Sequence, residues 1–166
     1  MRPRLLTLAA IVISLLAALG DASVAVKPDE PLYGAIAEGM WLRHDWVVPM
    51  FNGLQAWYKP PLLYWMAMGV MSVIGPSTLA LRLVTVACGL MLLWATFRLT
   101  RRLFDTDTAW TAVFLLGTSL GFVEYSRAYM MDLPLAWLYV ECCDRLWAAV
   151  MEGNRSAWIA LGAWAG

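Results

Sequence analysis

The sequence predicts an all-α protein, a polytopic bundle of transmembrane helices with interfacial helices in its first outer loop. Hydrophobic residues make up 61% of the 166 residues and charged residues only 14%, whereas soluble domains average roughly 45–50% and 25%. The apolar residues gather in runs long enough to cross a bilayer, and arginines cluster beside one of these runs. Basic and acidic residues balance at 12 each, so net charge gives no sign of a nucleic-acid partner.

The first predicted span covers residues 5–20 and follows Arg2 and Arg4. A helix of this length would rise about 24 Å, which suits a short span and also the apolar core of a signal peptide. Small residues around Ala22 offer a cleavage site, but we favour an uncleaved span because further apolar runs follow. Its basic flank then stays in the cytoplasm and Asp29 lies outside.

Residues 21–78 are predicted to form an outer loop that carries two interfacial helices. The first begins near Asp29, with Pro31 in its first turn, and its apolar residues recur at helical spacing up to Trp41. The second runs from Pro61 to Ile74 and would rise only about 21 Å, short of the roughly 30 Å hydrocarbon core. We therefore expect both helices to lie at the membrane surface.

Three further spans are predicted over residues 79–97, 109–123 and 133–150, and a last helix over 157–166 stops before it can cross. Residues 1–166 are thus expected to be the amino-terminal part of one transmembrane domain, inactive by itself. Arg98 and its neighbours follow the first of these spans, and the positive-inside rule places them in the cytoplasm. That placement requires that residues 61–74 do not cross. On this topology the outer surface carries Asp29, Lys59, Arg127 and Asp132.

The predicted span over 133–150 contains the charged residues Glu141, Asp144 and Arg145. Each charge costs about 2.5–3.5 kcal/mol at the centre of a membrane helix on insertion scales. Glu141 and Arg145 stand four residues apart, so they can pair on one helix face turned toward other helices. We favour a structural ion pair over a proton or ion pathway.

No metal site is predicted from the residues alone. The three cysteines, at positions 88, 142 and 143, lack metal-ligand spacing, and their odd number implies no disulfide framework. The single histidine, His44, is interpreted as an interfacial polar residue.

Three motifs occur in order along the chain. They are Asp29-Glu30, a Lys-Pro-Pro-Leu-Leu-Tyr-Trp stretch that begins at Lys59, and an arginine followed five positions later by an aspartate, Arg127 and Asp132. From about residue 28 onward the chain resembles the amino-terminal part of membrane glycosyltransferases of the GT-C class. It is most similar to the 4-amino-4-deoxy-L-arabinose lipid A transferases and related bacterial enzymes of the protein mannosyltransferase superfamily.

The resemblance implies sugar transfer from a polyprenyl-phosphate carrier to a lipid or protein acceptor at the outer face of the inner membrane. Asp29 would orient or deprotonate the acceptor as general base, with inversion at the anomeric carbon. Asp132 would be a supporting acid in the same cavity. Substrate binding would fall to Glu30, to Lys59, which offsets the charge on the departing lipid phosphate, and to Arg127, which holds that phosphate.

The chain departs from the aminoarabinose branch at two positions. Tyr58 stands where an acidic residue commonly precedes the lysine, and Leu32 stands where an arginine follows the Asp-Glu pair. The acidic residue is the one expected to contribute to a metal site. A divalent metal is therefore possible by resemblance but is not required, since cations can stabilise a monophosphate leaving group.

Simpler interpretations remain for each site residue. Asp29 and Asp132 can be plain helix caps, Lys59 can extend to the interface, and Arg127 can anchor the loop to lipid headgroups. Two other functional classes also remain open. One is a membrane transporter that uses Glu141 and Arg145 as a coupling site, and the other is a non-catalytic membrane subunit.

Overall fold

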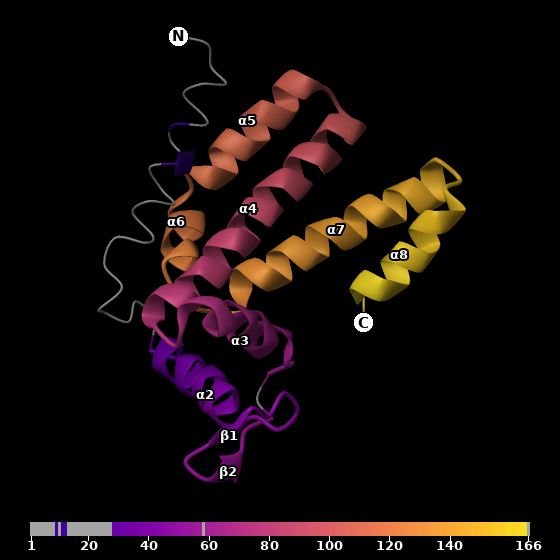
Figure 1. Cartoon of the computed structure of the whole chain (residues 1–166). Coiled ribbons are helices and arrows are strands. Elements are labelled where there is room, and N and C mark those ends of the chain that lie inside the picture. The colour runs from indigo at the N-terminus through magenta and orange to yellow at the C-terminus, as the bar shows by residue number, and fades with distance from the viewer. Residues whose placement is uncertain (1–8, 10, 13–27, 58, 166) are drawn as a thin grey trace.

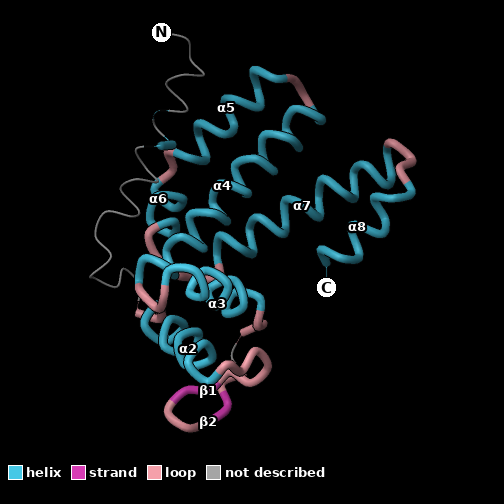
Figure 2. Tube along the Cα trace, in the orientation of Figure 1, coloured by secondary structure: helices cyan, strands magenta, loops and turns pink. Residues whose placement is uncertain are grey.

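A computed structural model describes residues 9, 11–12, 28–57 and 59–165 of the chain (Figure 1). The described part is helical apart from one two-stranded hairpin (Figure 2), so the predicted all-α class is confirmed. Most of the first predicted span, residues 5–20, and residues 21–27 lie outside the described residues. The helices are α2 (Glu30–Arg43), α3 (Leu62–Ile74), α4 (Thr78–Leu103), α5 (Thr106–Gly117), α6 (Leu120–Ser126), α7 (Asp132–Met151) and α8 (Arg155–Ala165).

Helix α4 is the centre of the bundle and packs against α3, α5, α6 and α7. Its start is capped by Ser77, whose hydroxyl accepts a hydrogen bond from the amide of Ala80 at 3.2 Å. Among the described residues it is the one helix that is both long and apolar enough to cross a membrane. It begins one residue before the predicted span over 79–97 and ends six residues after it. The later end arises because the segment that contains the arginines after residue 97 continues the helix.

Helix α3 is a separate short helix, in agreement with the short helix predicted over residues 61–74. Gly75 ends it with a φ of 82°, a left-handed value that favours glycine. The preceding outer loop also contains a hairpin that the sequence interpretation missed. Its strands β1 (Met50–Phe51) and β2 (Leu54–Gln55) flank Asn52-Gly53, whose positive φ angles of 52° and 79° suit a tight two-residue turn.

The predicted single helix over 109–123 is wrong in one respect, because the structure divides it into α5 and α6. Thr118 and Ser119 separate the two helices, and both hydroxyls donate to carbonyls of the last turn of α5. Ser119 also accepts a hydrogen bond from the amide of Phe122 at 3.3 Å and so caps α6. Side-chain hydroxyls that compete for backbone groups therefore explain the break.

Charged side chains join the distal end of α4 to α7. The predicted pairing of Glu141 with Arg145 is confirmed at 3.6 Å. The sequence interpretation missed a stronger partner: Arg98 of α4 donates to Glu141 at 2.6 Å and to Asp144 at 2.8 Å. Arg102 adds contacts to Asp144 at 3.5 Å and to Glu152 at 3.4 Å. The acids of α7 are thus neutralised by the arginines that follow the apolar part of α4.

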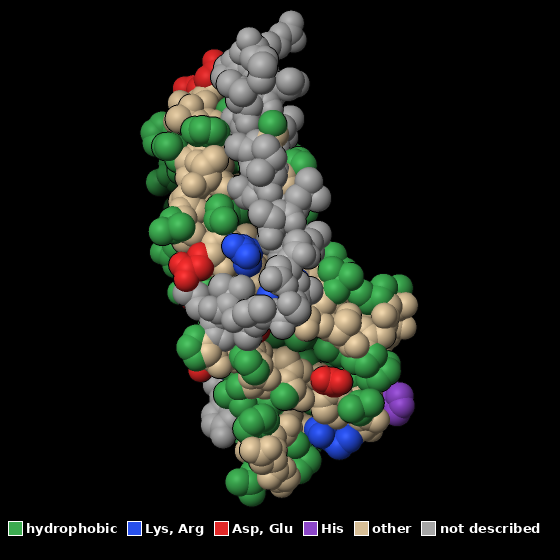
Figure 3. All heavy atoms as spheres, turned by 90° about the vertical axis from the view of Figure 1, so that its left-hand side faces the viewer, with side chains coloured by type: hydrophobic (Ala, Val, Ile, Leu, Met, Phe, Trp, Pro, Cys, Tyr) green, Lys and Arg blue, Asp and Glu red, His purple; other side chains and the backbone are tan. Residues whose placement is uncertain are grey.

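The molecule has two distinct ends. Figure 1 shows α4 running from the end that contains α2, α3 and the start of α7 to the opposite end, where α5 begins. The view in Figure 3 shows few charged side chains among hydrophobic ones on the face that it presents. The residues predicted to face outward and the arginine cluster predicted to face the cytoplasm therefore lie at opposite ends of α4, although the orientation itself stays a prediction.

Replacing Arg98 with glutamine should destabilise the protein more than the same change at Arg101. Removing Arg98 leaves two buried carboxylates without their closest partner, which should lower the free energy of unfolding by about 2–4 kcal/mol. Arg101 is exposed, and its guanidinium lies 5.7 Å from the centre of the Phe97 ring, so Arg101→Gln serves as the control. Unfolding in detergent measures both; equal stability of the two variants would contradict a structural role for the cluster.

Candidate catalytic and substrate-binding site

Tyr129 joins three segments that lie far apart in the sequence. Its backbone amide donates to the Glu30 carboxylate at 3.1 Å, and its hydroxyl donates to the carbonyl of Leu63 at 2.8 Å. The side chain is fully buried. The loop between α6 and α7 is thereby fixed to the first residue of α2 and to the first turn of α3.

Glu30 is buried, with only 3% of its surface exposed, and its carboxylate lies 3.8 Å from the guanidinium of Arg82. Arg82 belongs to the second turn of α4 and is completely buried. Glu30 is also the first residue of α2, where the helix dipole favours a negative charge. The Glu30 side chain is therefore held inside the protein and does not face an open surface.

The two candidate catalytic carboxylates are both exposed and neither caps a helix through its side chain. Asp29 occupies the N-cap position of α2 but accepts no capping hydrogen bond. Asp132 is the first residue of α7, whose N-cap position is Met131. The interpretation of either aspartate as a plain capping residue therefore loses its support, and both carboxylates are accessible for other chemistry.

The two candidate phosphate-binding cations differ in their surroundings. Lys59 is exposed and precedes α3 by three residues. Arg127 is half-buried at the C-cap of α6, and its Nε is buried with no hydrogen-bond partner among the described residues. A role of either cation in phosphate binding stays a prediction.

The contacts of Tyr129 bring most of the predicted site to one place. Asp29 directly precedes Glu30, while Arg127 and Asp132 flank Tyr129 at two and three residues' distance. The Tyr129–Leu63 hydrogen bond draws the start of α3, and with it the Lys59 segment, to the same end of the bundle. We call the meeting point of Tyr129, Glu30 and Leu63 the joint: Asp29 is next to Glu30 in the sequence, Arg127 and Asp132 lie on the connection that carries Tyr129, and Lys59 precedes α3.

Two buried residues of this joint, Arg82 and Tyr129, were given no role by the sequence interpretation. An arginine early in an apolar run is the signal that could have singled out Arg82, because an unpaired charge there is costly. Burial raises the pKa of Tyr64 to about 12 and the pKa of Tyr129 well above its ordinary value. Burial thus disfavours ionisation of both hydroxyls.

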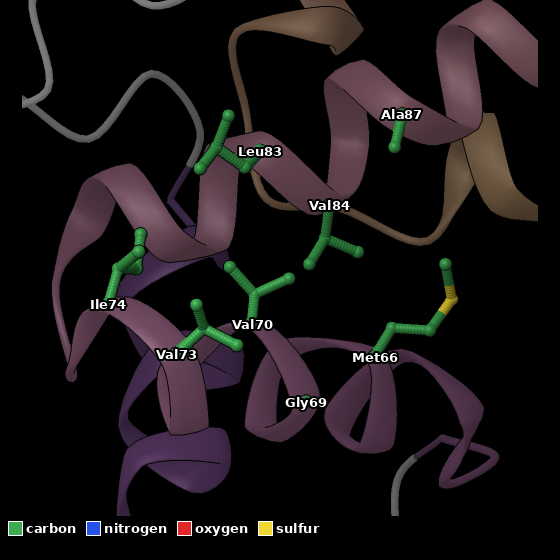
Figure 4. Close-up of a pocket in the computed structure, with 8 residues that line it drawn as sticks. All are labelled: Met66, Gly69, Val70, Val73, Ile74, Leu83, Val84 and Ala87. Carbon is green, nitrogen blue, oxygen red and sulfur yellow. The ribbon is translucent and has the colours of Figure 1, made fainter.

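An apolar groove of about 540 Å³ lies between α3 and α4 (Figure 4). Among the described residues, those that line it are aliphatic apart from Met66 and Gly69, and none of them is charged. Its chemistry suits a hydrocarbon and not a reaction that moves charge. The lining residues of the groove are Met66, Gly69, Val70, Val73, Ile74, Leu83, Val84 and Ala87.

Among the described residues, no three His, Cys, Asp or Glu side chains come together in a way that could hold a metal.

Sequence comparison assigns the chain to a family. The family model described as dolichyl-phosphate-mannose-protein mannosyltransferase matches residues 58–166. The chain belongs to this family. The match includes Lys59, Arg127 and Asp132 and begins after the Asp29-Glu30 pair.

Curated relatives extend the match toward the amino terminus. An undecaprenyl phosphate-alpha-4-amino-4-deoxy-L-arabinose arabinosyl transferase of Pseudomonas fluorescens is 31% identical over 139 residues, 83% of this chain and 24% of the relative. A transferase of the same name from Pseudomonas aeruginosa is 32% identical over 140 residues, 81% of this chain and 26% of the relative. The chain therefore spans about a quarter of the length of these relatives.

Solved structures share the fold. The crystal structure of ArnT from Cupriavidus metallidurans bound to undecaprenyl phosphate superposes with a TM-score of 0.81 at 20% identity, covering 96% of this chain and 30% of ArnT. The apo structure of the same protein gives a TM-score of 0.78 at 22% identity, covering 96% and 29%. The chain thus has the helical GT-C membrane fold that the sequence predicted.

Replacing Tyr129 with phenylalanine should lower the free energy of unfolding by about 1 kcal/mol, because it removes the hydrogen bond to Leu63. Tyr64→Phe is the matched control, since the Tyr64 hydroxyl is equally buried but meets no hydrogen-bond partner in the part of the chain that the structure describes. That change should be neutral or stabilising. Chemical unfolding of the two variants in detergent tests the difference, and a larger loss for Tyr64→Phe would disagree with the assigned contacts.

Proposed function

We propose that the protein of which this chain is a part transfers a sugar from a polyprenyl-phosphate carrier to a lipid or protein acceptor, a lipid A-like molecule in the first instance. The observation that supports the proposal is the joint at Tyr129, which connects the segments that carry two exposed carboxylates and a half-buried arginine. The relatives, which are named arabinosyl transferases, support the same reaction class.

In the proposed reaction, Asp29 is the general base. Its carboxylate takes the proton from the acceptor hydroxyl while that oxygen attacks the anomeric carbon of the sugar, and the bond from the sugar to the carrier phosphate breaks with inversion. Asp29 suits this role because it is exposed and free of a capping hydrogen bond. Asp132, the first residue of α7, is the proposed supporting acid.

The departing polyprenyl phosphate gains negative charge, which Arg127 and Lys59 are proposed to offset. Arg127 supports this role by its charge and by its position, because its half-buried side chain lies at the end of α6, on the connection that leads to Asp132. Glu30 fits direct substrate binding less well than the sequence interpretation expected. Its carboxylate is enclosed and already engaged with Arg82 and the amide of Tyr129.

The groove between α3 and α4 is the proposed place for part of the polyprenyl chain. Its lining is aliphatic, and it lies on α3, the helix that follows the Lys59 segment. A lipid whose phosphate is bound near Lys59 could therefore extend its hydrocarbon along α3. Crystallised ArnT, whose fold matches this chain, was solved with undecaprenyl phosphate bound.

We place the protein in the inner membrane as a multi-pass protein, with the site facing the periplasm. The positive-inside rule supports this orientation, because Arg98, Arg101 and Arg102 lie in the last two turns of α4, at the end opposite the site. The transporter alternative loses support from the ion pairs of Glu141. That carboxylate contacts both Arg98 and Arg145, and a carboxylate neutralised twice makes a poor coupling site for an ion or proton.

Asp29→Asn in the full-length protein should lower the rate of sugar transfer from a polyprenyl-phosphate donor by about 10²- to 10⁴-fold, the usual contribution of a general base. Glu38→Gln is the control, because Glu38 is an exposed carboxylate on the same helix away from the joint, and it should leave the rate unchanged. Undiminished transfer by Asp29→Asn would refute the base assignment. Absence of sugar transfer by the wild-type protein would refute the proposal that it is a glycosyltransferase.

Gly69→Leu should raise the KM for a long-chain donor by about tenfold, since the added side chain displaces roughly two buried methylenes of the lipid. A Cβ at Gly69 meets no atom within 4 Å, so the groove accepts the side chain without a clash. Gly162→Leu in α8, where a Cβ also has open space, is the control. A donor with a carrier too short to reach the groove should show no change, and an equal effect on both donors would contradict this placement.

A further inference from the structure

The ion pair of Arg82 and Glu30 is costly for a structural contact alone. Arg82 is completely buried and Glu30 nearly so, and taking both charges out of water costs several kcal/mol for each ion. Apolar residues of similar volume commonly stabilise a buried position as well or better. The pair at this position therefore calls for a reason other than stability.

The pair fixes the exact segment that carries the proposed base. Glu30 directly follows Asp29, so any shift of the first turn of α2 moves both carboxylates. Oε1 of Glu30 meets Arg82 at 3.8 Å on one side and the amide of Tyr129 at 3.1 Å on the other. A second contact lies one turn further along α2, where a Cβ on Gly34 would come within 2.9 Å of Leu81. The first two turns of α2 therefore approach α4 at two points, Arg82 and Leu81.

The same carboxylate also fixes the other half of the site. Arg127 and Asp132 belong to the short connection centred on Tyr129, and the amide of Tyr129 is held by Glu30. One oxygen atom thus relates the α2 segment to the α6–α7 connection. Catalysis is sensitive to such relations, because a misplacement of about 1 Å can lower a rate by about 100-fold.

We propose that Arg82 and Glu30 are positioning residues, which hold the carboxylate of Asp29 in place without touching the substrate. Arg82 fixes Glu30 to α4, and Glu30 fixes the loop that carries the phosphate-binding arginine. This inference rests on the proposed sugar transfer. It assigns to Arg82 a function in the reaction, although its guanidinium is completely enclosed.

The decisive variant is the double substitution Glu30→Leu with Arg82→Met in the full-length protein. Replacing both partners avoids an unpaired buried charge, so the free energy of unfolding of the double variant should be at least as high as that of the wild type. Its kcat should nevertheless fall by about 10- to 100-fold while the KM for the donor stays near the wild-type value, because positioning acts on the transition state. Arg82→Lys, which keeps the charge beside Glu30, should retain most of the rate.

Arg98→Gln is the matched control, because it removes a paired arginine from the other end of the same helix. It should lower stability without lowering kcat. Hydrogen exchange provides a readout that does not depend on activity: the amide of Tyr129 should exchange faster in the double variant, because leucine offers no acceptor, while amides in the middle of α7 keep their protection.

A stable double variant with wild-type kcat would overturn the proposal, and so would unchanged exchange at Tyr129. A loss of kcat by Arg98→Gln as large as that of the double variant would also overturn it, since general loosening of the bundle would then explain both. Absence of transfer by the wild type would instead refute the proposed function. In that case the exchange of the Tyr129 amide still decides whether the pair fixes the loop.

Discussion

The structure depends on one buried carboxylate, that of Glu30. Glu30 is the first residue of α2. Its carboxylate pairs with the enclosed guanidinium of Arg82 and accepts a hydrogen bond from the backbone amide of Tyr129. A buried carboxylate is tolerated only when its charge and its lone pairs are both satisfied, so the three groups must stay together. The segments that carry them, α2, α4 and the α6–α7 connection, consequently meet at one place.

The same physical rule operates at the other end of α4. Arg98 and Arg102 contact the acids of α7, so the long helix carries a paired arginine near each end. Apolar side chains alone give helices in a lipid environment little reason to associate, and polar contacts supply specificity. The two charged clusters therefore connect α2 and α7 to opposite ends of α4.

Most helices follow from local patterns in the sequence. The apolar run before the arginines predicts α4, and proline at one end with Gly75 at the other predicts α3. The break at Ser119 was missed, because hydroxyl side chains within an apolar run are compatible with either a continuous helix or a cap. The hairpin at Asn52-Gly53 was missed despite a favourable turn dipeptide, since its strands of two residues each are too short to show alternation.

By itself, the sequence determined the helical class, the family motifs and the candidate residues Asp29, Arg127 and Asp132, because periodicity and motif order are local properties of the chain. Tertiary structure alone decided that Glu30 faces inward, that Arg82 is its partner and that Arg98 reaches the acids of α7. Glu30 and Arg82 are about fifty positions apart in the sequence, and Arg98 is 43 positions from Glu141 and 46 from Asp144. No local pattern specifies such partners, because the choice depends on which helix faces pack together and exclude water.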